Sequence, residues 1–148
     1  MKSISLKWVV TFISGLILFL GTYYFAMDFE YISYDVTDKG QFVMHDGLNE
    51  PAPIINTDVS NEKEGLAELG TQMERFNWWV LASMIAAPLF IATYYVLLSN
   101  HEAWNQTIRK RYLKLTILIN VGVAAVFIVQ WIRYAHIINE SMHILFFK

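Results

Sequence analysis

Three long apolar stretches alternate with polar segments along the chain. They cover about residues 8–27, 76–98 and 113–134. A bilayer hydrocarbon core of about 30 Å needs roughly 20 helical residues at about 1.5 Å rise each, and every stretch is long enough. The pattern predicts an all-α integral membrane protein, in which residues 1–148 form a single membrane domain with three transmembrane helices.

The polar segment between the first and second spans, residues 28–75, begins with two β-prone runs. Residues 30–37 and 41–44 are joined by Asp38-Lys39-Gly40, with glycine where a left-handed residue is needed, which predicts a small hairpin. Prolines within residues 49–53 are predicted to interrupt regular structure after it. A hairpin of this size is marginal alone, so we expect it to rest on another surface.

An amphipathic helix is predicted to follow, with Ser60 as its N-cap. Gly65 and Gly70 weaken this helix by about 1 kcal/mol each relative to alanine, so it needs a surface to pack on, either the protein's own or a partner's. Its apolar side chains recur at three- and four-residue steps and lead into the second span. We expect this stripe to dock on a partner protein through Leu66, Leu69, Met73 and Phe76.

Charge is divided unevenly between the polar segments. Residues 28–75 hold eleven acidic and three basic residues, a net charge of −8, whereas the rest of the chain carries +6. Lys2 and Lys7 precede the first span, and residues 99–112 between the second and third spans contain Arg109-Lys110-Arg111. The positive-inside rule therefore predicts a cytoplasmic N-terminus and loop 99–112, with residues 28–75 and the tail 135–148 extracytoplasmic.

The first span has a rival interpretation as a cleaved signal peptide. Its apolar run of about 20 residues exceeds the usual 7–15, and no small-x-small cleavage site follows Tyr23-Tyr24-Phe25-Ala26-Met27. A retained signal anchor in the inner (cytoplasmic) membrane is therefore expected. The tail after the third span is apolar and is predicted to rest at the outer membrane interface.

Small residues in the spans predict where helices touch, because lipid competes equally well for large apolar side chains. Pro88, in the second span, is expected to kink the helix near mid-membrane. The first span offers Ser14, Gly15 and Gly21 as a weaker signal. The predicted helix-packing residues are Ala82, Ser83, Ala86 and Ala87 in the second span and Gly122 and Ala125 in the third.

Polar side chains of the third span fall on one helix face at 100° per residue. This polar stripe consists of Thr116, Asn120, Gln130 and Tyr134. Hydrogen bonding between helices explains it, at about 0.6 kcal/mol for each bond, and the lining of an ion or quinone path is the alternative. In either case the face is predicted to be buried in protein.

Residues with metal or redox chemistry are few. The chain has no cysteine, which excludes disulfides, thiolate zinc sites and iron–sulfur clusters. His136, Glu140 and His143 share one helix face, but about 10 Å separates the two histidines along the axis, so no metal site is expected. A haem is not expected either, because His45, His101 and His136 are not predicted at matching depths within the membrane.

The sequence therefore predicts a non-enzymatic accessory or scaffolding subunit, whose partners are the lipid bilayer and other membrane protein subunits. No cofactor is expected. The basic loop is too small to indicate nucleic-acid binding and is typical of a topology signal. One alternative is a small homo-oligomeric channel or transport component. Another is a subunit contributing to a quinone or haem pocket through Trp131, Arg133 and His136.

Overall fold

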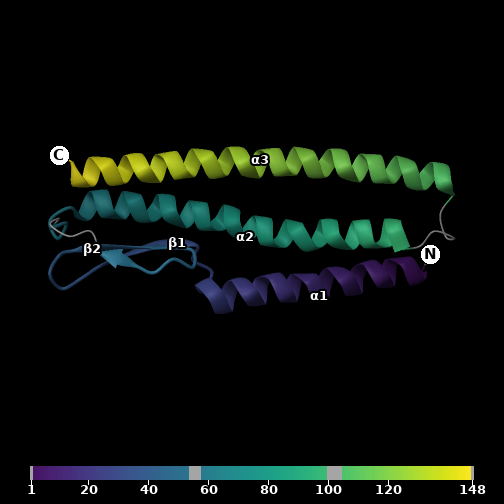
Figure 1. Cartoon of the computed structure of the whole chain (residues 1–148), viewed down its shortest axis with the longest axis horizontal. Coiled ribbons are helices and arrows are strands. Elements are labelled where there is room, and N and C mark those ends of the chain that lie inside the picture. Colours follow the sequence, from purple (N-terminus) through teal and green to yellow (C-terminus); the bar gives the residue numbers. More distant parts are fainter. Residues whose placement is uncertain (1, 54–57, 100–104, 148) are drawn as a thin grey trace. The chain divides into compact units, whose positions relative to one another are not determined.

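The computed structural model describes residues 2–53, 58–99 and 105–147. Its three helices are α1 (Lys2–Met27), α2 (Lys63–Ser99) and α3 (Gln106–Phe146). All three are long and apolar enough to cross a membrane. Between α1 and α2 lie the strands β1 (Ile32–Val36), β2 (Phe42–Asp46) and β3 (Ala52–Pro53) (Figure 1). The protein is thus mostly helical, with one small sheet.

The chain divides into two compact units. Residues 1–25 and 81–128 form one, here called the helical unit, and residues 26–80 and 129–148 form the other, here called the sheet unit. Helices α2 and α3 contribute to both units. At about 1.5 Å per residue, the 41 residues of α3 extend about 60 Å, twice a hydrocarbon core of about 30 Å. Residues 135–146, which were predicted as a tail after the third span, belong to this helix.

The sheet is antiparallel, in the order β1-β2-β3. The predicted hairpin is present: Val36 pairs with Phe42, and Gly40 has a left-handed φ of 72° in the connection between β1 and β2. Sequence analysis missed β3, in which Ala52 and Pro53 pair with Met44 and Val43. A proline is compatible with this position because β3 is an edge strand, where a missing backbone N–H costs little.

The sheet unit has its own apolar core between the sheet, the first half of α2 and the last part of α3. In Figure 1 the hairpin lies beside the first half of α2. Phe42 and Leu69 are 0% exposed, and Met73 and Phe76 are at most 3% exposed. Two glycines of α2 make room for this packing: a Cβ at Gly65 would lie 3.1 Å from Leu145, and one at Gly70 would lie 3.4 Å from Tyr34.

This core changes the interpretation of the predicted docking stripe. Leu69, Met73 and Phe76 are buried by residues of the same chain, and Leu66 is half-buried. They form core packing and are not available as a docking surface. The helix also begins at Lys63, later than predicted, because the Glu62 carbonyl accepts its first hydrogen bond and the Ser60 side chain donates to Asp58 instead.

The C-terminal part of α3 completes the same core. Ile138 and Leu145 are buried, and the Phe146 ring lies 5.2 Å from that of Phe42 in an edge-to-face contact. Part of the predicted interfacial tail is therefore core packing, because helix α3 continues through Phe146. Ile144 and Phe147 are 60% and 74% exposed, so the contact of the tail with the membrane interface stays a prediction.

Candidate functional site

In the helical unit, α1 packs against the second half of α2. Pro88 is fully buried, and a Cβ at Gly15 would lie only 2.8 Å from the Pro88 Cβ, so the two backbones approach closely. Helix α2 is continuous through Pro88. The Trp8 indole N–H donates to the Thr93 hydroxyl over 3.1 Å, which adds a polar link between the same helices.

The predicted helix-packing residues have different environments in the structure. Ala82, Ser83, Ala86 and Ala87 are all half-buried on α2. On α3, Gly122 and Ala125 are exposed, and a Cβ added at Gly122 would meet no atom within 4 Å. The close approach at Gly15 was only a weak signal in the sequence, because a lone glycine does not name the residue that it meets.

The polar stripe of α3 is divided between the two units. In the helical unit, Asn120 is half-buried and its side-chain N–H donates to the Tyr94 hydroxyl of α2 over 3.4 Å. In the sheet unit, the Gln130 side-chain oxygen is buried without a hydrogen-bond partner among the described residues, and Tyr134 lies beside Phe76. Asn120 thus faces α2 within the chain.

The opposite face of α3 is uncovered. At 100° per residue, Ala125 lies about 180° from the centre of the polar stripe, and Leu118 and Gly122 lie within about 60° of Ala125. Leu118 is 69% exposed, and Val121 is 62% exposed. We call this surface, formed by Leu118, Val121, Gly122 and Ala125, the open face of α3.

A cavity of about 330 Å³ lies among the three helices of the helical unit. Helix α1 contributes Trp8 and Val9, α2 contributes Thr93 and Val96, and α3 contributes Tyr112 and Thr116 to its walls. Thr116, the first residue of the predicted polar stripe, therefore borders this cavity. Sequence analysis did not predict the cavity, because it requires positions from all three helices.

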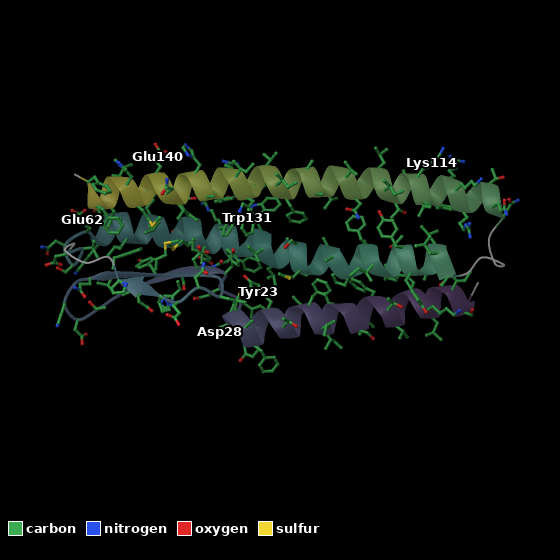
Figure 2. The ribbon with its side chains drawn as sticks, in the orientation of Figure 1. Tyr23, Asp28, Glu62, Lys114, Trp131 and Glu140 are labelled. Carbon is green, nitrogen blue, oxygen red and sulfur yellow. The ribbon has the colours of Figure 1, made fainter. Side chains whose placement is uncertain are left out.

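An aromatic cluster connects the sheet to α2 and α3 in the sheet unit. The Trp131 ring lies 4.8 Å from that of Phe76 and 5.2 Å from that of Tyr31, both edge to face. Figure 2 labels Trp131 on α3. Burial and the nearby Asp46 carboxylate raise the pKa of Tyr31 above its usual value. These contacts give Trp131 a packing role between the three elements.

One polar residue of α2 holds the start of the sheet. The Ile32 N–H donates to the Asn77 side-chain oxygen over 3.0 Å, and the Asn77 side-chain N–H donates to the Ile32 carbonyl over 2.8 Å. Asn77 therefore takes the place of a neighbouring strand for this residue. Sequence analysis missed Asn77, because a single asparagine at the start of an apolar run gives no sign of its distant partner.

The candidate metal and redox residues lie in exposed parts of the sheet unit. The His136 side chain is 79% exposed, and its Nε2 lies 3.9 Å from a Glu140 carboxylate oxygen. Within residues 2–53, 58–99 and 105–147, no three His, Asp or Glu side chains are grouped closely enough to hold a metal ion. The Arg133 guanidinium lies 5.9 Å from the Tyr134 ring centroid. His101 lies outside the described residues.

A comparison with protein-family models, curated proteins and solved structures finds no match for this chain. The functional assignment therefore rests on the chain's own residues and geometry.

Proposed function

We propose that this protein is a non-enzymatic accessory or scaffolding subunit of a larger complex in the inner (cytoplasmic) membrane. Three helices of suitable length and apolarity are compatible with membrane insertion. The N-terminus and the loop between α2 and α3 are placed in the cytoplasm, because the basic residues are concentrated there. The acidic residues 28–75 and the tail 135–148 are then extracytoplasmic.

The observation that supports an accessory role is the open face of α3. Lipid tails solvate large apolar side chains as well as protein does, so small residues matter mainly where another backbone approaches. Among the described residues, no atom lies within 4 Å of a Cβ added at Gly122, and Ala125 is exposed. A transmembrane helix of another subunit is the partner that fits this surface.

Enlarging the small residues of the open face tests the proposal directly. Gly122→Leu combined with Ala125→Leu should abolish co-purification of partner subunits in mild detergent, because the added side chains prevent close helix approach. Ile117→Leu combined with Ile119→Leu, at exposed positions of the same helix outside the open face, serves as the control and should leave the complex intact. Unchanged subunit composition in the Gly122/Ala125 variant would refute the assigned docking surface.

The topology has a separate test, which uses the absence of native cysteine. Asn61→Cys, at an exposed position of the sheet unit, should react with a membrane-impermeant thiol reagent in intact cells. Gln106→Cys, at the exposed start of α3, is the matched control and should react only after lysis. The opposite labelling pattern would invert the proposed orientation.

The alternative function is a small homo-oligomeric channel or transport component. The half-buried Asn120 amide favours it, as does the Gln130 oxygen, which has no hydrogen-bond partner among the described residues. Polar groups inside a membrane domain often mark a path. The mass of the detergent-purified protein separates the two functions. A symmetric oligomer of this chain alone supports the channel, and additional subunits support the accessory role.

A further inference from the structure

The cavity of the helical unit has no role in the accessory function. Its volume of about 330 Å³ falls in the range of about 300–1,000 Å³ that is typical of small-molecule sites. All of its walls come from residues of the helical unit, and each of α1, α2 and α3 contributes to them. The cavity is therefore a feature of the packed helices and does not depend on the sheet unit.

The walls of the cavity are mainly apolar in character. The Trp8 indole N–H donates a hydrogen bond to the Thr93 hydroxyl, and this hydroxyl donates to the Leu89 carbonyl over 2.8 Å. These two polar groups are thus satisfied within the protein, and Val9 and Val96 present hydrocarbon beside them. The Ser5, Tyr112 and Thr116 side chains add hydroxyl groups at the wall, but most of the lining is hydrocarbon. An alkyl chain therefore matches these walls better than a strongly polar metabolite, which would lose most of its hydration here.

The charged residues in the described part of the helical unit are basic. Residues 2–25, 81–99 and 105–128 of the helical unit include six basic residues and no acidic one. Arg109 is half-buried on α3, one helical turn before Tyr112 of the cavity wall and on the same side of the helix. Lys110, Arg111 and Lys114 lie on the same turns. An anionic group close to the cavity would therefore be attracted to this end of α3.

We propose that the cavity binds one acyl chain of an anionic phospholipid, with the lipid phosphate near Arg109. The apolar walls match the acyl chain, and the basic residues at the start of α3 match the phosphate. The inference rests on the membrane insertion proposed above, and it does not depend on the accessory role. It assigns the lipid to the leaflet on the side of the basic residues.

Native mass spectrometry of the full chain purified in mild detergent tests this site. The probes are phosphatidylglycerol and phosphatidylcholine with identical acyl chains, and inorganic phosphate as a competitor. We expect the wild-type protein to retain phosphatidylglycerol about tenfold more tightly than phosphatidylcholine, a difference of about 1.4 kcal/mol. Inorganic phosphate should not displace the lipid, since it cannot fill the cavity.

Two pairs of variants examine the cavity and its rim separately. Val9→Phe with Thr116→Phe fills the cavity and should lower phosphatidylglycerol retention about tenfold, whereas Val10→Phe with Ile117→Phe, at the adjacent positions, should not. Arg109→Gln should remove the preference for phosphatidylglycerol over phosphatidylcholine, and Arg109→Lys should keep it. The Arg109 pair remains informative if the filled variant does not fold.

Three results would overturn the proposal: equal retention in the filled variant and its control, an unchanged lipid preference in Arg109→Gln, or displacement of the lipid by phosphate alone. Alkaline carbonate extraction of wild-type membranes tests membrane insertion separately from the lipid site. Release of the protein by carbonate would refute membrane insertion, and with it the proposed function. Retention in the membrane without selective lipid binding would refute only the lipid site.

Discussion

Replacing Phe42 with alanine should lower the free energy of unfolding of the sheet unit by about 3–5 kcal/mol. Phe42 is 0% exposed, and its ring stacks on that of Tyr34 at 5.3 Å and meets that of Phe146 edge to face at 5.2 Å. It therefore joins the hairpin to the end of α3. Alanine would leave a cavity that the surrounding helices and strands fill only in part.

Native-state hydrogen exchange in detergent measures this loss at the backbone amides of β1 and β2, which open with the unit. Phe147→Ala is the matched control, since Phe147 is 74% exposed and its removal should cost less than about 0.5 kcal/mol. Similar exchange in the two variants would show that the hairpin does not depend on the core around Phe42.

Asn77→Leu should have the second largest effect, a loss of about 2–3 kcal/mol from the sheet unit. Leucine has a similar volume but leaves both the N–H and the carbonyl of Ile32 without their partner, and an unpaired buried polar group costs about 1–3 kcal/mol. The effect should be local at first, because Asn77 bonds only the start of β1 among its described contacts.

The exchange rate of the Ile32 amide hydrogen is the most direct measurement for Asn77→Leu, and it should rise more than the rates within β2. Asn61→Leu provides the control, because Asn61 is exposed and the same substitution there should change stability by less than about 0.5 kcal/mol. A protected Ile32 amide in the Asn77 variant would mean that another group accepts its hydrogen bond.

The predicted docking stripe shows where sequence reasoning reached its limit. The three- and four-residue spacing of Leu66, Leu69 and Met73 gives the helix and its apolar face, but the spacing does not identify what covers that face. The printed sequence does not show that Tyr34 of β1 donates a hydrogen bond to the Leu66 carbonyl, or that Trp131 of α3 packs against Phe76. A periodic apolar pattern indicates that one face of a helix is buried. It does not indicate which residues cover that face, because these residues are brought there by folding.

Local sequence patterns were sufficient to predict the helices and the hairpin of this protein. Apolar length gave the three long helices, and the Asp38-Lys39-Gly40 connection gave the hairpin, because both depend on properties of neighbouring residues. Three features appear only in the folded protein: the contact of Gly15 with Pro88, the hydrogen bonds between Asn77 and Ile32, and the open cavity lined by three helices. The hydrogen bond between Asn77 and Ile32 joins positions 45 residues apart, and no local pattern encodes such contacts, since each depends on how the whole unit packs.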